Sequence, residues 1–200
     1  MEQVRLLDQL VSKTAPGRSP DFTKAHLLYA LILLSDQRIG RKQLAEELRL
    51  GEGTIRTILG RLQDEELIEI SRPGVKLSSH GETYLKAIES VIKWKPLPGT
   101  EITVDKVNWV VLVRGVSEKV RLGVEQRDQA LIHGATGATT LVYHGGVWVI
   151  PGIDEEVEDK ILEGLSDFNP VENDVAIIGS SSDGFTSALG ALAAAIDLLF

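Results

Sequence analysis

The chain contains no cysteine, so it can form no disulfide and can offer no thiolate as a nucleophile or metal ligand. It has no apolar run near the roughly 18 residues that suggest a membrane span. Its first residues, MEQVRLLDQLV, mix charges into a helical pattern where a secretory signal would have a continuous apolar stretch. Together these absences predict a cytoplasmic protein without a membrane segment.

Charge is distributed unevenly along the 200 residues, whose formal net charge is −8. Residues 1–100 hold 15 Lys and Arg against 13 Asp and Glu, a net +2. Residues 101–200 hold 6 against 16, a net −10. This asymmetry indicates two parts with different partners, of which only the first can approach nucleic acid without a large repulsion.

A proline- and glycine-containing stretch, KWKPLPGTE at residues 93–101, lies where the charge changes. Such a stretch interrupts helices and strands, so we expect a linker with a domain boundary at about residue 98. The expected domains are residues 1–97 and 98–200.

The first half predicts helices over residues 2–13, 22–35, 41–48 and about 52–65, then a hairpin, then a further helix beginning near residue 78. Asp21 is the expected N-cap of the second helix, and His26 within it is expected to be a packed side chain. QRIG, at residues 37–40, is expected to be a short extended stretch. The hairpin comprises residues 67–71 and 75–77 around a Pro-Gly turn.

The fourth helix has two faces with different chemistry. Ile55, Ile58, Leu59 and Leu62 recur at i, i+3, i+4 and i+7, which predicts a buried arc. Glycines and arginines fill the opposite arc, where glycine allows another surface to approach the backbone closely and arginine can contact phosphates or guanine. This helix is therefore the expected recognition helix for a DNA major groove. The candidate DNA-binding residues are Arg41, Lys42, Gly53, Arg56, Thr57, Gly60, Arg61, Arg72 and Lys76.

The phrases QLAEELRLGEGTIRTILGRLQDEELIEI and LSSHGETYL resemble those of winged helix-turn-helix transcription regulators, over roughly residues 22–92. Gly40 and Gly51 stand where that family usually has Ser or Thr, and glycine is an acceptable N-cap. With its second half, the chain resembles uncharacterised archaeal-type winged-helix regulators that carry a C-terminal α+β domain. The resemblance implies a partner in double-stranded DNA.

The second half predicts strands over residues 107–115 and 119–124, a helix over 125–134, a hairpin over 138–152, a helix over 154–165, a strand over 173–181 and a last helix over 185–200. This ββαββαβα order predicts an α+β two-layer sandwich with an antiparallel sheet. A ferredoxin-like arrangement is the alternative if KVRLGV, residues 119–124, is not a strand.

The loop IIGSSSDGF, between the last strand and the last helix, is the candidate effector site. Amides at a helix N-terminus attract anions, while Asp183 favours an amine or hydroxyl ligand. An ordinary strand-to-helix loop capped by Ser182 or Asp183 is the alternative. The candidate ligand-binding residues are Ser180, Ser181, Ser182 and Asp183. The sequence nominates no catalytic residue, no metal ligand and no cofactor.

The leading hypothesis is a DNA-binding transcription regulator whose C-terminal domain dimerises and senses a small molecule. The homodimer contact is expected on strands or on the small-residue helix SALGALAAAIDLLF rather than on the acidic DEEVEDK. One alternative is a winged-helix adaptor that binds protein and not DNA. The other is an enzyme active in the C-terminal domain. The operator, the effector and the direction of regulation are not encoded in any recognisable motif.

Overall fold

The computed structural model describes residues 2–12, 20–153, 155–157 and 164–200, and the chain divides into two compact units, Met1–Ser90 and Val91–Phe200. The division precedes the boundary expected near residue 98 because residues 92–97 form a strand of the second unit. Among the described residues, no helix is both long and apolar enough to cross a lipid bilayer.

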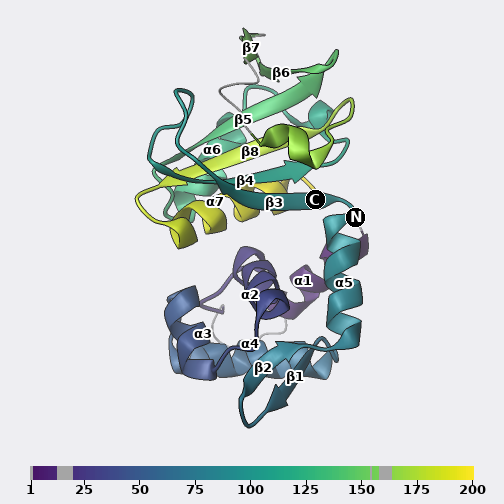
Figure 1. Ribbon diagram of the computed structural model, residues 1–200, viewed down its shortest axis with the longest axis vertical. Helices are drawn as coiled ribbons and strands as arrows, with labels where there is room; N and C mark the ends of the chain where they lie inside the picture. Colours follow the sequence, from purple (N-terminus) through teal and green to yellow (C-terminus); the bar gives the residue numbers. More distant parts are fainter. Residues whose placement is uncertain (1, 13–19, 154, 158–163) are drawn as a thin grey trace. The chain divides into compact units, whose positions relative to one another are not determined.

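The N-terminal unit consists of helices with a two-stranded hairpin at their edge (Figure 1). In chain order its elements are α1 (Glu2–Ser12), α2 (Lys24–Asp36), α3 (Arg41–Leu48), α4 (Glu52–Asp64), β1 (Ile68–Ser71), β2 (Gly74–Leu77) and α5 (Ser79–Glu89). These elements match the predicted order closely. Gly40 and Gly51 are N-caps, as expected from the sequence.

The cap of α2 differs from the expectation. Thr23, not Asp21, is the N-cap, and its backbone N–H donates to Nδ1 of His26 over 3.1 Å. His26 is therefore half of a reciprocal cap rather than an inert packed side chain.

The C-terminal unit is a six-stranded sheet in the order β3-β4-β8-β5-β6-β7, in which every pair is antiparallel. The strands are β3 (Ile92–Leu97), β4 (Val107–Val113), β5 (Gly137–His144), β6 (Val147–Ile150), β7 (Glu155–Val157) and β8 (Val175–Ser181). Two helices, α6 (Val124–Ile132) and α7 (Gly184–Asp197), pack against it and against each other. The expected α+β class with an antiparallel sheet is confirmed.

Both faces of the central sheet are covered. Gly179 faces α7 so closely that an added Cβ would lie 2.4 Å from the carbonyl oxygen of Ser187. The opposite face carries an apolar cluster that includes Val110, Ile178 and Phe168, the last from the short 3-10 helix η2 (Leu165–Phe168). Coverage on both sides explains why every residue of β8 is buried and apolar or small.

Three sequence predictions in this unit are wrong. KWKPLPGTE begins within β3, where Pro96 is tolerated because an edge strand leaves one side of its backbone unpaired. KVRLGV is not a strand: Leu122 is 63% exposed and Gly123, at φ 73°, caps α6. A short 3-10 helix, η1 (Ser117–Lys119), precedes it instead.

The third wrong prediction concerns the helix over residues 154–165, which the structure contradicts at residues 155–157. Residues 155–157 form β7, in which Val157 pairs with Trp148 of β6 and is buried. Residues 154 and 158–163 lie outside the described part of the chain. Without a strand at 119–124, β4, α6 and β5 form a split β-α-β unit, with β8 antiparallel between the two strands.

A glycine fixes the approach of α5 to the end of α4. An alanine Cβ at Gly81 would lie 2.0 Å from the backbone carbonyl oxygen of Leu67. Because the clash is with backbone, no side-chain rotation can remove it. We therefore expect Gly81→Ala to lower the free energy of unfolding by about 1–3 kcal/mol. Gly53→Ala is the matched control, because a Cβ there meets nothing within 4 Å. Urea unfolding followed by circular dichroism measures both, and a Gly81→Ala protein as stable as the original would contradict this contact.

Candidate nucleic-acid interface

Helix α4 presents two different faces, as its periodicity predicts. Ile55, Ile58, Leu59 and Leu62 are at most 2% exposed and anchor the helix in the core of the N-terminal unit. The opposite side carries the candidate contact residues of this helix. Glu52, Gly53, Arg56 and Thr57 are exposed there, while Gly60 and Arg61 are half-buried.

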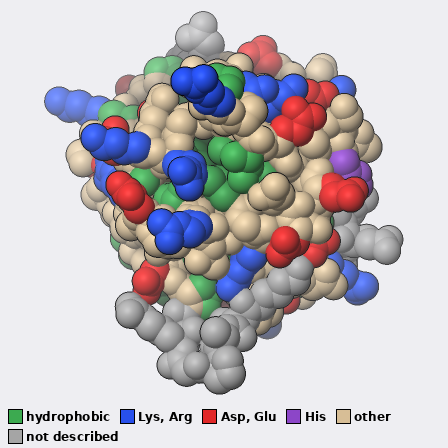
Figure 2. All heavy atoms as spheres, turned by 90° about the horizontal axis from the view of Figure 1, so that it is seen from below, with side chains coloured by type: hydrophobic (Ala, Val, Ile, Leu, Met, Phe, Trp, Pro, Cys, Tyr) green, Lys and Arg blue, Asp and Glu red, His purple; other side chains and the backbone are tan. Residues whose placement is uncertain are grey.

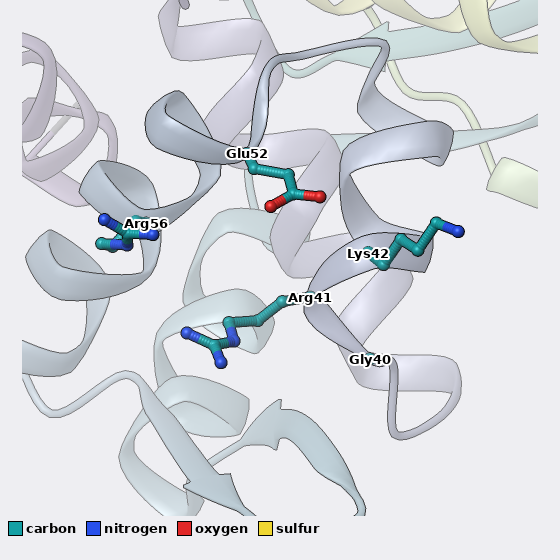
Figure 3. A pocket seen from close by; sticks show the side chains of 5 residues that line it. All are labelled: Gly40, Arg41, Lys42, Glu52 and Arg56. Carbon is teal, nitrogen blue, oxygen red and sulfur yellow. The ribbon is translucent and has the colours of Figure 1, made fainter.

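An open hollow of about 390 Å³ lies where α3 and α4 begin, lined by Gly40, Arg41, Lys42, Glu52 and Arg56. In Figure 3 the guanidinium group of Arg41 extends toward the side on which Arg56 lies, while the Lys42 ammonium group points away. The structure thus brings three of the predicted contact residues, Arg41, Lys42 and Arg56, to one place. Within the described residues, none of the three has an ion-pair partner.

A tight turn joins α3 to α4 and sets where α4 begins. Arg49, at φ 50°, adopts the left-handed conformation that ends α3, and its N–H donates to the carbonyl oxygen of Glu46 over 3.2 Å. Two residues later Gly51 caps α4. Because unpaired amides give helix N-termini partial positive charge, the hollow attracts anions through its backbone as well as its arginines.

The hairpin is fastened to the segment that precedes α3. Ile39 and Val75 exchange two backbone hydrogen bonds of 2.8 Å, and Arg38 donates to Ser71 Oγ and to the Gly74 carbonyl oxygen. Gly74, at φ 135°, admits this approach, since a Cβ there would lie 2.8 Å from the Ile39 carbonyl oxygen. The hairpin tip and the first turn of α3 therefore form one continuous surface.

Arg38 is a residue of this surface that the sequence did not nominate. The extended QRIG stretch was the available signal, because an extended segment beside a two-stranded hairpin suggests a third pairing partner. Figure 2 shows Lys and Arg side chains gathered around a small apolar patch on this unit, with acidic side chains beside them.

The two candidate residues of the hairpin differ in their surroundings. Arg72 is exposed in the turn, whereas Lys76 pairs across the strands with Glu69 at 3.3 Å. Both side chains are exposed to solvent, 44% for Lys76 and 53% for Glu69, so this ion pair contributes little to stability. Arg72 is the freer cation of the two.

The glycines on α4 have no role in internal packing. A Cβ at Gly53 or Gly60 would meet nothing within 4 Å, so alanine could occupy either position and would favour the helix by about 1 kcal/mol. Thr57 donates its hydroxyl to the carbonyl oxygen of Gly53 over 3.2 Å. The two glycines therefore leave the backbone accessible on this face and make the helix less stable than alanines would.

Arg61 has an internal role instead. Its guanidinium donates to the carbonyl oxygens of Leu10 and Val11, in the last turn of α1, and stacks over the Phe22 ring at 5.2 Å. These carbonyls have no partner within their own helix, so the arginine caps α1. The sequence placed Arg61 on the outer arc correctly, but that arc is covered there by α1.

The Ser-rich loop is shorter than its sequence suggested. Ser180 and Ser181 belong to β8 and are buried, with the Ser180 hydroxyl donating to Asn108 Oδ1 over 2.6 Å. Asp183 caps α7, accepting from the backbone N–H and the hydroxyl of Thr186 at 2.9 Å each. Of the four candidate ligand residues, Ser182 alone is exposed.

The small-residue helix α7 is buried from Ser187 to Ile196. Gly190 lies where a Cβ would be 2.8 Å from the Cβ of Ala135, so its small residues serve close packing inside the unit.

Two family models match the chain. Residues 26–83 match the PH0730-like, N-terminal domain, and residues 104–198 match a domain of unknown function, DUF4443. No curated protein matches it.

Among solved structures the chain is similar to the hypothetical protein PH0730 from Pyrococcus horikoshii OT3. The identity is 24% and the TM-score 0.73, over 89% of this chain and 93% of that one. At this identity the likeness establishes a shared fold across both modules.

The contacts of Arg61 yield a test of its role. Arg61→Ala should lower the free energy of unfolding by about 1.5–3 kcal/mol, because it removes charged hydrogen bonds to the end of α1. Arg56→Ala, an exposed arginine on the same helix, should change it by no more than about 0.5 kcal/mol. Urea unfolding measures the change in the free energy of unfolding for both variants. Equal changes would contradict the structural role of Arg61.

Proposed function

We propose that the N-terminal unit is a winged helix-turn-helix domain that binds double-stranded DNA, and that the protein is a cytoplasmic transcription regulator. Helix α4 is the recognition helix and the β1–β2 hairpin is the wing. One observation carries the proposal: Arg41 and Arg56 line an open hollow between two helix N-termini, with Lys42 at its edge. Such a surface is suited to a phosphate backbone and to the guanine edges of a major groove.

The charge distribution supports this assignment of partners. A net +2 over residues 1–100 conceals a local cationic surface, whereas residues 101–200 are strongly acidic. Screening limits the reach of the acidic half to about 8–10 Å at ordinary ionic strength. A basic surface farther away than this can bind DNA in a chain of net negative charge.

The C-terminal unit has a supporting role in this proposal. We assign it the pairing of two copies, so that two α4 helices reach half-sites about one helical turn apart. A small-molecule effector acting through the end of β8 and the start of α7 belongs to the same proposal. The proposal includes no reaction catalysed by the protein.

Arginine-to-alanine variants test the DNA contact. Arg56→Ala should weaken binding to a selected duplex about 5- to 150-fold, because a base-reading contact contributes about 1–3 kcal/mol. Arg127→Ala, an exposed arginine on α6, is the control and should bind as the original does. Fluorescence anisotropy over a series of salt concentrations measures affinity. If no duplex binds in a salt-dependent manner, the adaptor alternative replaces this proposal.

The hairpin gives a graded prediction. Neutralising Arg72 should reduce the log–log salt slope of binding by about one unit, because one phosphate contact is lost. Neutralising Lys76 should reduce it less, since Glu69 already offsets part of that charge. The same salt titration measures both variants. Slopes that match the unmodified protein would place the hairpin away from the DNA.

A further inference from the structure

Glu52 stands out within the cationic surface. It is the first residue of α4, is exposed, and lines the hollow together with Arg41 and Arg56. In the described part of the chain its carboxylate makes no hydrogen bond and no ion pair. Figure 3 shows the carboxylate projecting into the space between α3 and α4 rather than folding back on Arg56.

The chemistry of a carboxylate restricts what Glu52 can contact on DNA. It has acceptors and no donors, so it repels every phosphate along the backbone. In the major groove the donors are the amino groups of cytosine and adenine, and glutamate accepts from cytosine N4. An acid at this position therefore opposes binding unless a base amino group meets it.

We propose that Glu52 is a specificity-determining residue that reads a cytosine amino group in the major groove; this rests on the DNA-binding role proposed above. Glu52 and Arg56 are one helical turn apart on the same face, about 6 Å along the axis. Successive bases of one strand are about 3.4 Å apart. The selected site therefore contains a cytosine within about two base pairs of the guanine that Arg56 reads.

Glu52 also has a structural role, and a test has to distinguish that role from base reading. An acid in the first turn stabilises a helix through its dipole. Helix α5 offers a matched case, because Glu82 is an exposed acid in its first turn. Glu82→Ala removes the same helix-end interaction from an element outside the hollow.

The experiment is selection of bound duplexes from a random library, with the full chain and with Glu52→Ala, Glu52→Gln and Glu82→Ala. Glu52→Ala should lose about 5- to 150-fold of discrimination at the cytosine position. It should also bind unselected duplexes more tightly, because a charge that repels phosphate is gone. Glu52→Gln should shift the preference at that position toward adenine, which glutamine reads through N6 and N7. Thermal unfolding of each variant establishes that it is folded.

The outcomes separate the two proposals. If the unmodified chain selects no sequence and binds no duplex, the DNA-binding role itself fails. If it selects a site that Glu52→Ala selects equally, that role stands and the reading by Glu52 is overturned. Equal losses in Glu52→Ala and Glu82→Ala also overturn it, since the loss then comes from the helix end. Loss confined to the Glu52 variants, with a cytosine-to-adenine shift in Glu52→Gln, supports it.

Discussion

The pairing of Ile39 with Val75 is the constraint on which the candidate interface depends. Two backbone hydrogen bonds join a short extended segment to the hairpin, and the same segment leads directly into α3. Without them, the hairpin would be a two-stranded element of marginal stability. With them, Arg72 and the hollow between α3 and α4 belong to one surface. Gly74 is the residue that makes the approach sterically feasible.

The arginines of the N-terminal unit show how similar sequence positions acquire different roles. Arg56 and Arg61 both lie on the outer arc of α4, yet one faces the hollow and the other caps α1. Arg38, four residues before Lys42, holds the hairpin instead of facing the hollow. An arginine already bonded to carbonyl oxygens gains less from a phosphate, because it has to give up those bonds first.

Much of the N-terminal unit was predictable because its signals are local. The four apolar residues of α4 repeat with helical periodicity, and this alone fixed which face is buried. The partner of Arg61 was not predictable, since it lies some 50 residues earlier in the chain. The same reason applies to Ser180, whose hydroxyl is bound by Asn108 from another strand. The local sequence pattern predicts on which helix or strand these side chains lie. It does not predict which residues, distant in the sequence, contact them.

In the C-terminal unit the wrong secondary-structure predictions have a common cause, which is that strands form by pairing with other strands. KVRLGV alternates like a strand but pairs with no strand in the described part of the chain, while the acid-rich residues 155–157 form a strand because β6 lies beside them. The alternation of apolar residues and the composition are properties of a single segment, whereas a strand also needs backbone hydrogen bonds to a neighbouring strand. The candidate effector loop shows the same limit, because its first two serines are the paired end of β8.

The outer edge of β3 is poorly suited to pairing with a strand of another molecule. Pro96 removes one amide from that edge, and Lys95 is held by Asp167 and the Gly164 carbonyl oxygen beside it. An incoming strand would lack a complete row of donors and would have to displace these contacts. Growth of the sheet from chain to chain is therefore blocked at this end. Among the described strands, β7 is left as the edge at which a neighbouring molecule could add.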